Sequence, residues 1–276
     1  MHRIDRCFAE LERAGKKALC VYLCVGDPSL DESMELALEA LDAGADLLEL
    51  GVPFSDPTAD GPVLARASRR ALAAGATIER VIDVARGLRE RSNAPLVLFT
   101  YYNPVFVTGE QRVVNLASEA GMDALLVVDL PPEEAGGLRS ACTERGLGLV
   151  PLVTPTTDAA RLEVIRRLSQ VPEGAPQAFV YAVSMTGVTG ALPADVAAMG
   201  RSAVTFRRTF ARPVLVGFGI DGAESARAAA GSNDAGPDGI VVGTAVVRHI
   251  EQGISRKERV RLVRAFVYEL RDALDA

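Results

Sequence analysis

Residues 18–51, ALCVYLCVGDPSLDESMELALEALDAGADLLELG, contain one complete unit of the pattern that decides the fold. The unit begins with an apolar run at 18–24 and ends with a second at 47–51. Between them, residues 30–43 carry apolar side chains at helical spacing. The tripeptide Gly44-Ala45-Asp46 precedes the second run, as a short helix-to-strand turn does. Two nearly continuous apolar strands joined through a helix predict a parallel pair covered by helices.

The same rhythm continues along the chain. Gly121-Met122-Asp123 and Pro237-Asp238-Gly239 precede two further strands in the same way. The expected strands are 18–24, 47–51, 96–100, 124–128, 147–153, 178–183, 214–217 and 240–243. The amphipathic stretches include 30–43, 78–91, 111–120, 132–145 and 158–168. Eight strand–helix units without a break in composition predict an α/β protein, a single (β/α)8 TIM barrel spanning residues 1–276 as one domain.

Two segments lie outside the eight units. Residues 3–14 are predicted to form an N-terminal helix that caps the bottom of the barrel, and residues 255–274 a long charged C-terminal helix. We interpret both helices as structural, because helices that flank a barrel usually only cover apolar surface.

Composition excludes several classes of protein. The 276 residues are 49% hydrophobic and 24% charged, with a net charge of −6, which argues against disorder and against a nucleic-acid-binding surface. No apolar run is long enough for a membrane span, and no signal peptide is evident. With only two histidines and three lysines, a histidine-rich metal site and a Schiff-base lysine are not expected. The four cysteines lack C-x-x-C spacing, so we expect reduced or buried thiols and a cytoplasmic protein.

Carboxylates follow the second expected strand, at the end of a barrel where active sites lie. If Leu48 and Leu50 face the helices, Glu49 faces the apolar interior, where burial raises a carboxyl pKa into a useful range for proton transfer. The structural alternative for Glu49 is a salt bridge. Asp60 is either functional or the N-cap of the helix that follows Gly61, and its spacing alone favours the cap. Asp56 suits a turn.

Three glycine-rich segments follow the last three strands: residues 187–190, 217–220 and 243–245. The loops after strands seven and eight of a barrel often bind phosphate through backbone N–H groups and a helix N-terminus. Tight turns are the alternative for each glycine-rich segment. Four aromatic residues are expected to face the interior or wall a pocket: Tyr22, Tyr101, Tyr181 and Phe218. A barrel tyrosine is more often part of the core than catalytic.

The run E-L-G-V-P-F-S-D-P-T-A-D-G-P at 49–62 resembles the signature of the tryptophan synthase alpha subunit family. Gly-Asp-Pro at 26–28, Tyr-Asn-Pro at 102–104, Asp-Leu-Pro at 129–131 and the three glycine-rich segments follow in matching order. The resemblance implies a TIM-barrel lyase that cleaves indole-3-glycerol phosphate to indole and glyceraldehyde 3-phosphate in tryptophan biosynthesis. It also implies no cofactor in this chain, and a partner beta subunit that carries pyridoxal phosphate, in an alpha2beta2 heterotetramer.

The resemblance carries over to individual positions. It implies that Glu49 is the general acid and base, that Asp60 binds the indole N–H, and that Tyr181 is an active-site tyrosine. Substrate contacts are implied for Tyr22, Tyr101, Thr189, Gly190, Phe218, Gly219, Gly243 and Thr244. Loops that face the beta subunit or close over the site are implied for Asp56, Pro57, Asn103 and Pro104. No metal ligand is implied.

The chemistry suits this set of residues. A retro-aldol cleavage needs an acceptor for the electrons of the broken C–C bond, and an indole protonated at C3 can accept them without an imine or a metal. Two alternatives stay open: a stand-alone lyase that needs no beta subunit, and a non-catalytic regulatory subunit that binds a phosphosugar. A generic phosphosugar isomerase would leave the run at 49–62 unexplained.

Overall fold

The strands of the computed structural model all belong to one sheet. The structure describes residues 1–183, 196–217, 219–231 and 236–276. The strands are β1 (Ala18–Cys24), β2 (Leu47–Gly51), β3 (Leu96–Thr100), β4 (Ala124–Val127), β5 (Gly148–Leu149), β6 (Leu152–Val153), β7 (Val180–Val183), β8 (Val214–Gly217) and β9 (Gly239–Val242). They pair in parallel in the order β5-β4-β3-β2-β1-β9-β8-β7-β6.

The sheet closes into a barrel through the chain between β5 and β6. These two strands are halves of the single strand expected at 147–153, which is interrupted at Pro151, a residue without an N–H to donate. Before the break, Val150 N donates to Leu125 O at 2.9 Å; after it, Tyr181 N donates to Pro151 O at 3.0 Å. The first half therefore pairs with β4 and the second with β7. The expected eight-strand barrel is confirmed, and one of its strands is broken by proline.

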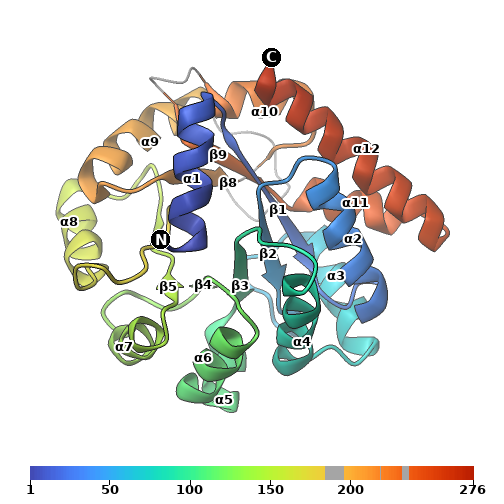
Figure 1. Cartoon of the computed structure of the whole chain (residues 1–276), viewed down its shortest axis with the longest axis horizontal. Coiled ribbons are helices and arrows are strands. Elements are labelled where there is room, and N and C mark those ends of the chain that lie inside the picture. Colours follow the sequence, from blue (N-terminus) through green and yellow to red (C-terminus); the bar gives the residue numbers. More distant parts are fainter. Residues whose placement is uncertain (184–195, 218, 232–235) are drawn as a thin grey trace.

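The helices surround the barrel (Figure 1). They are α1 (Arg3–Ala14), α2 (Leu30–Asp42), α3 (Pro62–Ala73), α4 (Ile78–Arg89), α5 (Tyr102–Thr108), α6 (Glu110–Glu119), α7 (Gly136–Glu144), α8 (Ala159–Leu168), α9 (Val196–Phe210), α10 (Ala223–Ala230), α11 (Thr244–Gln252) and α12 (Arg256–Asp275). The expected helices are present with ends shifted by a few residues, and α7 begins four residues later than expected, after the turn at 132–135. α5 was not expected.

Strand alternation divides the apolar side chains into layers. Leu48 and Leu50 belong to the core between the strands and the helices, whereas Leu47 belongs to the core inside the barrel. The inner core also contains Phe8 and Phe179, whose ring centroids lie 6.2 Å apart. Phe8 comes from α1, which lies inside the ring of helices across one end of the barrel (Figure 1). The prediction that this helix caps the bottom of the barrel is confirmed.

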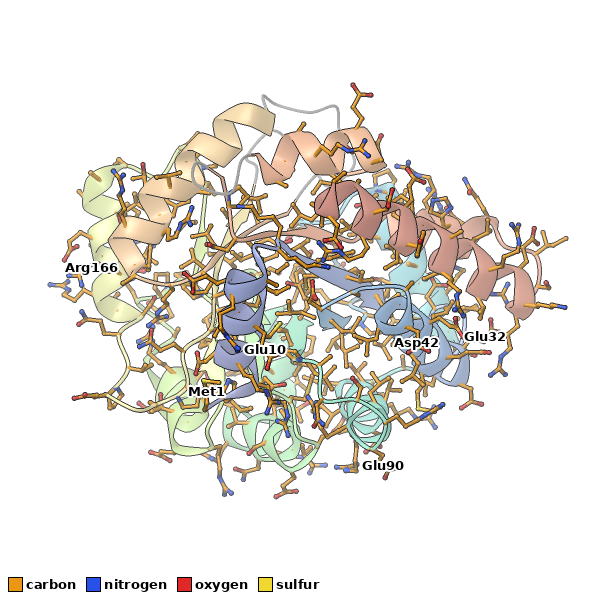
Figure 2. All side chains as sticks on the ribbon, turned by 45° about the horizontal axis from the view of Figure 1, so that its top comes forward. Met1, Glu10, Glu32, Asp42, Glu90 and Arg166 are labelled. Carbon is orange, nitrogen blue, oxygen red and sulfur yellow. The ribbon has the colours of Figure 1, made fainter. Side chains whose placement is uncertain are left out.

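The C-terminal helix α12 lies on the outside of the barrel. It contacts α2, α10 and α11. Arg259 pairs with Glu32 of α2 at 2.7 Å, and Figure 2 shows Glu32 beside α12. The predicted terminal helix therefore covers the outer apolar surface and attaches to α2 through ion pairs.

The strand starts are held together by a repeated aspartate contact. Asp46, Asp123 and Asp238 each stand just before a strand, and each carboxylate accepts the backbone N–H of the neighbouring strand: Leu19 at 2.8 Å, Leu96 at 2.9 Å and Val214 at 2.8 Å. Each aspartate also donates its own N–H back to that same residue. An arginine binds each carboxylate in turn: Arg271, Arg89 and Arg207. The three Asp-containing turns read from the sequence therefore act as clamps between paired strands.

We expect Asp123→Ala to lower the free energy of unfolding by about 3–5 kcal/mol, because a buried ionised acceptor would be removed from its cationic partners. Asp123 is 0% exposed and binds Arg3, Arg89 and the Leu96 N–H. Urea unfolding measures the change. Asp83→Ala, which removes an exposed partner of Arg86 within α4, is the control and should leave stability unchanged. Equal effects of the two substitutions would contradict the clamp.

Candidate active site

Glu49 is a fully buried carboxyl group at the centre of the site. It lies on β2 opposite Tyr22 of β1 and Val97 of β3, and it is 0% exposed. Within the described part of the chain, neither carboxyl oxygen has a hydrogen-bond partner. Burial raises the pKa of Glu49 to about 8. The salt-bridge alternative is therefore wrong, and Glu49 is a carboxyl that holds or releases a proton close to neutral pH.

Asp60 is the second carboxyl group of the site, and it lies in the loop between β2 and α3. The hydroxyl of Tyr101 donates to it and accepts the Ala59 N–H at 3.0 Å. Burial raises the pKa of Asp60 to about 6, and the Tyr101 hydrogen bond opposes that rise. The N-cap of α3 is Gly61, so the cap interpretation of Asp60 is wrong. The Asp60 carboxylate instead lies beside Tyr101 at the mouth of the barrel, where it is available to a ligand.

Tyr22 and Tyr181 face the same interior as Glu49. They are 6% and 8% exposed, and burial keeps the pKa of both hydroxyls well above the usual value, so both stay protonated. The charge of Glu49 raises both pKa values further. The Tyr22 ring lies against Gly51 and the Tyr181 hydroxyl against Gly217, where a Cβ would collide with them. These two glycines allow the tyrosines to reach inward.

Aromatic rings line the site around the two carboxyl groups. The ring of Tyr22 meets that of Phe99 edge-on, with ring centroids 5.0 Å apart. The ring centroids of Phe54 and Tyr101 lie 5.2 Å apart. Phe54 and Phe99 were not among the predicted site residues. The signal for Phe99 was its place on an expected strand, but strand periodicity does not reveal that it meets Tyr22 from the neighbouring β1.

The predicted phosphate-binding residues lie at the ends of β8 and β9. Gly219 follows β8, and Gly243 is the N-cap of α11, whose first residue is Thr244. Among the described residues no side chain caps this helix, and uncapped N–H groups at a helix N-terminus attract an anion. Thr189, Gly190 and Phe218 lie outside the described residues.

The four residues expected to face a partner lie on two neighbouring segments. Asp56 and Pro57 are in the loop after β2, where Ser55 donates to Asp56 at 2.6 Å. Asn103 and Pro104 lie in the first turn of α5, not in a loop. The residue that stabilises the start of this helix is Asp129, which follows β4 and accepts the Tyr102 N–H at 2.7 Å. The same helix exposes two large apolar side chains, Phe106 at 68% and Val107 at 75%.

Comparison with known proteins decides the family. The family model for the tryptophan synthase alpha chain matches residues 8–274. The tryptophan synthase alpha chain of Xanthomonas axonopodis pv. citri is 43% identical over 277 residues, covering 100% of this chain and 99% of its own. That of Geotalea daltonii is 43% identical over 262 residues, covering 95% of both. A crystal structure of tryptophan synthase subunit alpha from Legionella pneumophila superposes with a TM-score of 0.88 at 33% identity, covering 100% of this chain and 99% of that one.

The chain belongs to the tryptophan synthase alpha chain family.

Membership of this family establishes the reaction. The chain is an indole-3-glycerol-phosphate lyase and catalyses the alpha reaction of tryptophan biosynthesis. It uses no cofactor of its own, and the pyridoxal phosphate of tryptophan synthase belongs to the beta subunit. In the described residues, no three metal-ligating side chains come together, and no helix is both long and apolar enough to span a membrane.

We expect the stability of the chain to depend on pH through Glu49. The native carboxyl keeps its proton up to about pH 8, whereas the unfolded one loses it above 4.5. Between these values the native state binds more protons, so the free energy of unfolding falls as pH rises, by about 1.4 kcal/mol per pH unit. Glu49→Gln removes this contribution of Glu49 to the pH dependence of the free energy of unfolding. Urea unfolding of both proteins from pH 5 to pH 8 tests it, and parallel curves would contradict the raised pKa.

Proposed function

We propose that Glu49 and Asp60 divide the cleavage of indole-3-glycerol phosphate between them. Glu49, protonated because it is buried, gives its proton to C3 of the indole ring. The resulting Glu49 carboxylate then takes the proton of the hydroxyl on the adjacent side-chain carbon. A carbonyl forms there as the C–C bond breaks, and its electron pair returns to the ring. The proton that Glu49 gave stays on C3 of the released indole, and Glu49 ends protonated again because it holds the proton taken from the hydroxyl.

Asp60 stabilises the positive charge that develops on the ring nitrogen when C3 is protonated. The lower pKa of Asp60, about 6 against about 8 for Glu49, supports this division. At pH 7 Asp60 is ionised and Glu49 holds a proton, as the two roles require. This difference in pKa carries the proposal.

The remaining predicted residues bind the substrate. We assign Tyr181 a catalytic role beside Glu49, because Glu49 and Asp60 both act electrostatically on its hydroxyl. Tyr22, Tyr101 and Phe218 wall the indole pocket. The phosphate is held by backbone and hydroxyl groups, without a lysine: Thr189, Gly190, Gly219, Gly243 and Thr244.

We expect Glu49→Gln to lower the rate of indole formation by about 10²- to 10⁴-fold, the usual contribution of a positioned acid or base. Asp60→Asn keeps the shape of the side chain but removes its charge, so the rate of indole formation should fall by about 10²-fold. The assay is indole release from indole-3-glycerol phosphate with beta subunit present. Asp42→Asn on the outer face of α2 is the control. A Glu49→Gln protein with unchanged turnover would contradict the assignment.

We infer that the chain works with a beta subunit that carries pyridoxal phosphate, in an alpha2beta2 heterotetramer. The apolar side chains of α5 next to Asn103 and Pro104 support a partner surface, together with the loop at Asp56 and Pro57. Large exposed apolar groups of this kind mark contact sites. A crystal structure of tryptophan synthase from M. tuberculosis in an aminoacrylate-bound form contains a chain that is 27% identical to this one.

We expect Phe106→Ser to weaken binding of a tryptophan synthase beta subunit by about tenfold, as loss of a well-packed interface aromatic does. Tyr268→Ser on α12 is a matched control, since Tyr268 is 67% exposed and Phe106 68%. Calorimetric titration measures both affinities, and indole release measures the acceleration by the partner. Equal binding of both variants would contradict the surface. If the chain alone releases indole rapidly and the partner does not change that rate, the chain is instead the stand-alone lyase.

Two further proposals concern the whole chain. We infer a single domain, since all the described strands join one closed sheet. We also infer a cytoplasmic protein, because its four cysteines, Cys7, Cys20, Cys24 and Cys142, are free thiols.

A further inference from the structure

Four charged side chains form a continuous chain of hydrogen bonds, here called the charge chain: Asp27, Arg70, Glu251 and Arg66. Arg70 donates to both oxygens of Asp27, at 2.7 and 2.8 Å, and to Glu251 Oε1 at 2.8 Å. Arg66 donates to both oxygens of Glu251, each at 2.7 Å. Every link is a charge-assisted hydrogen bond of good length, and the two bidentate pairs fix orientation as well as distance.

The charge chain is partly shielded from water. Asp27 is 1% exposed, and the side chains of Arg70 and Glu251 are 33% and 27% exposed. Hydrogen bonds from Arg66 and Arg70 lower the pKa of Glu251 to about 2. Glu251 is therefore ionised at neutral pH and carries the charge that both arginines bind.

The charge chain joins three segments at the end of the barrel that carries the site. Asp27 follows β1, Arg66 and Arg70 lie one turn apart on α3, and Glu251 lies on α11. α3 starts two residues after Asp60, so the position of this helix determines the position of that carboxyl. α11 starts at Thr244, so its position determines where its N-terminal N–H groups point.

Apolar packing alone leaves the register of the two helices weakly defined. α3 contributes Leu64, Ala67 and Ala71 to a cluster that also contains Val247 of α11. Apolar contacts of this kind are non-directional and fix the position of one helix along another less precisely than hydrogen bonds do. The directional contacts between α3 and α11 are the hydrogen bonds of the arginines to Glu251.

We propose that the charge chain sets the spacing between Asp60 and the N-terminus of α11, and that Arg70 and Glu251 are positioning residues for the cleavage. The inference rests on the proposed function, in which Asp60 binds the indole end of the substrate and α11 the phosphate end. A substrate held at both ends reacts well only if the two anchors keep the right distance. Neither residue touches the substrate; each acts through the helix that it holds.

Binding of separate fragments and of a linked ligand tests the spacing directly. The probes are indole, glycerol 3-phosphate, and indole-3-propanol phosphate, which joins both ends but lacks the hydroxyl groups needed for cleavage. The variant is Glu251→Ala. Its matched control is Glu39→Ala, which removes a similar ion pair between α2 and α12, with Glu39 23% exposed and 3.1 Å from Arg264.

In Glu251→Ala, the Kd of the linked ligand should rise about tenfold, while the Kd of each fragment changes less than about twofold, since only the geometry of linkage is lost. The kcat for indole-3-glycerol phosphate should fall by a further factor of about ten, because the indole ring no longer lies correctly against Asp60. Glu251→Gln keeps one acceptor oxygen for Arg66 Nε and Arg70 Nη1 but loses the charge and the acceptor for Arg66 Nη2, so it should recover part of both losses. It also serves if Glu251→Ala does not fold.

Two results would overturn the proposal. One is a Glu251→Ala protein whose linked ligand binds as tightly as in Glu39→Ala. The other is an equal loss for the linked ligand and both fragments, which would mean local damage to the anchors. A failure of the proposed function is separate: it would appear as an unchanged rate of indole release in Glu49→Gln or Asp60→Asn, with Glu251 intact.

Discussion

A carboxyl group inside a closed apolar barrel is the constraint on which the rest of this site depends. Glu49 has no hydrogen-bond partner among the described residues, and it keeps a proton near neutral pH only while water is excluded. Exclusion requires a closed sheet, an inner layer of large apolar side chains and a helix across the bottom. The split strand around Pro151 and the packing of Phe8 on Phe179 therefore serve the chemistry as well as the stability.

The two ends of the barrel use charge in different ways. At the strand starts, the carboxylates of Asp46, Asp123 and Asp238 accept from backbone N–H groups and arginines, and these contacts join neighbouring strands. At the strand ends, no group in the described part of the chain donates to Glu49, and Asp60 accepts from Tyr101. A carboxylate that is fully hydrogen-bonded is a poor proton carrier, because its ionised form is held in place. Stability and catalysis are thus separated along the barrel axis.

Much of this arrangement could be predicted from the sequence, because strand bounds such as Ala18–Cys24 follow from uninterrupted apolar runs, and the inward direction of Glu49 follows from strand alternation. The contacts that define Asp60 could not. Its partner Tyr101 lies in a distant segment, between β3 and α5, and the cap of α3 is decided by backbone geometry at Gly61. α5 was missed for the same reason, since Asp129 satisfies its first turn from a distant segment.

The division of labour between the two carboxyl groups follows from their different burial and from one hydrogen bond. Burial raises the pKa of both, to about 8 for the fully buried Glu49 and to about 6 for the half-buried Asp60. The Tyr101 hydroxyl favours the ionised form of Asp60, whereas nothing in the described residues does so for Glu49. The Ala59 N–H donates to the same hydroxyl and the Tyr101 ring packs against Phe54 in a tilted arrangement, so both contacts orient the hydroxyl before substrate arrives. An acid and an anion therefore coexist in one small apolar site, which is the condition for protonating a carbon while stabilising the charge that results.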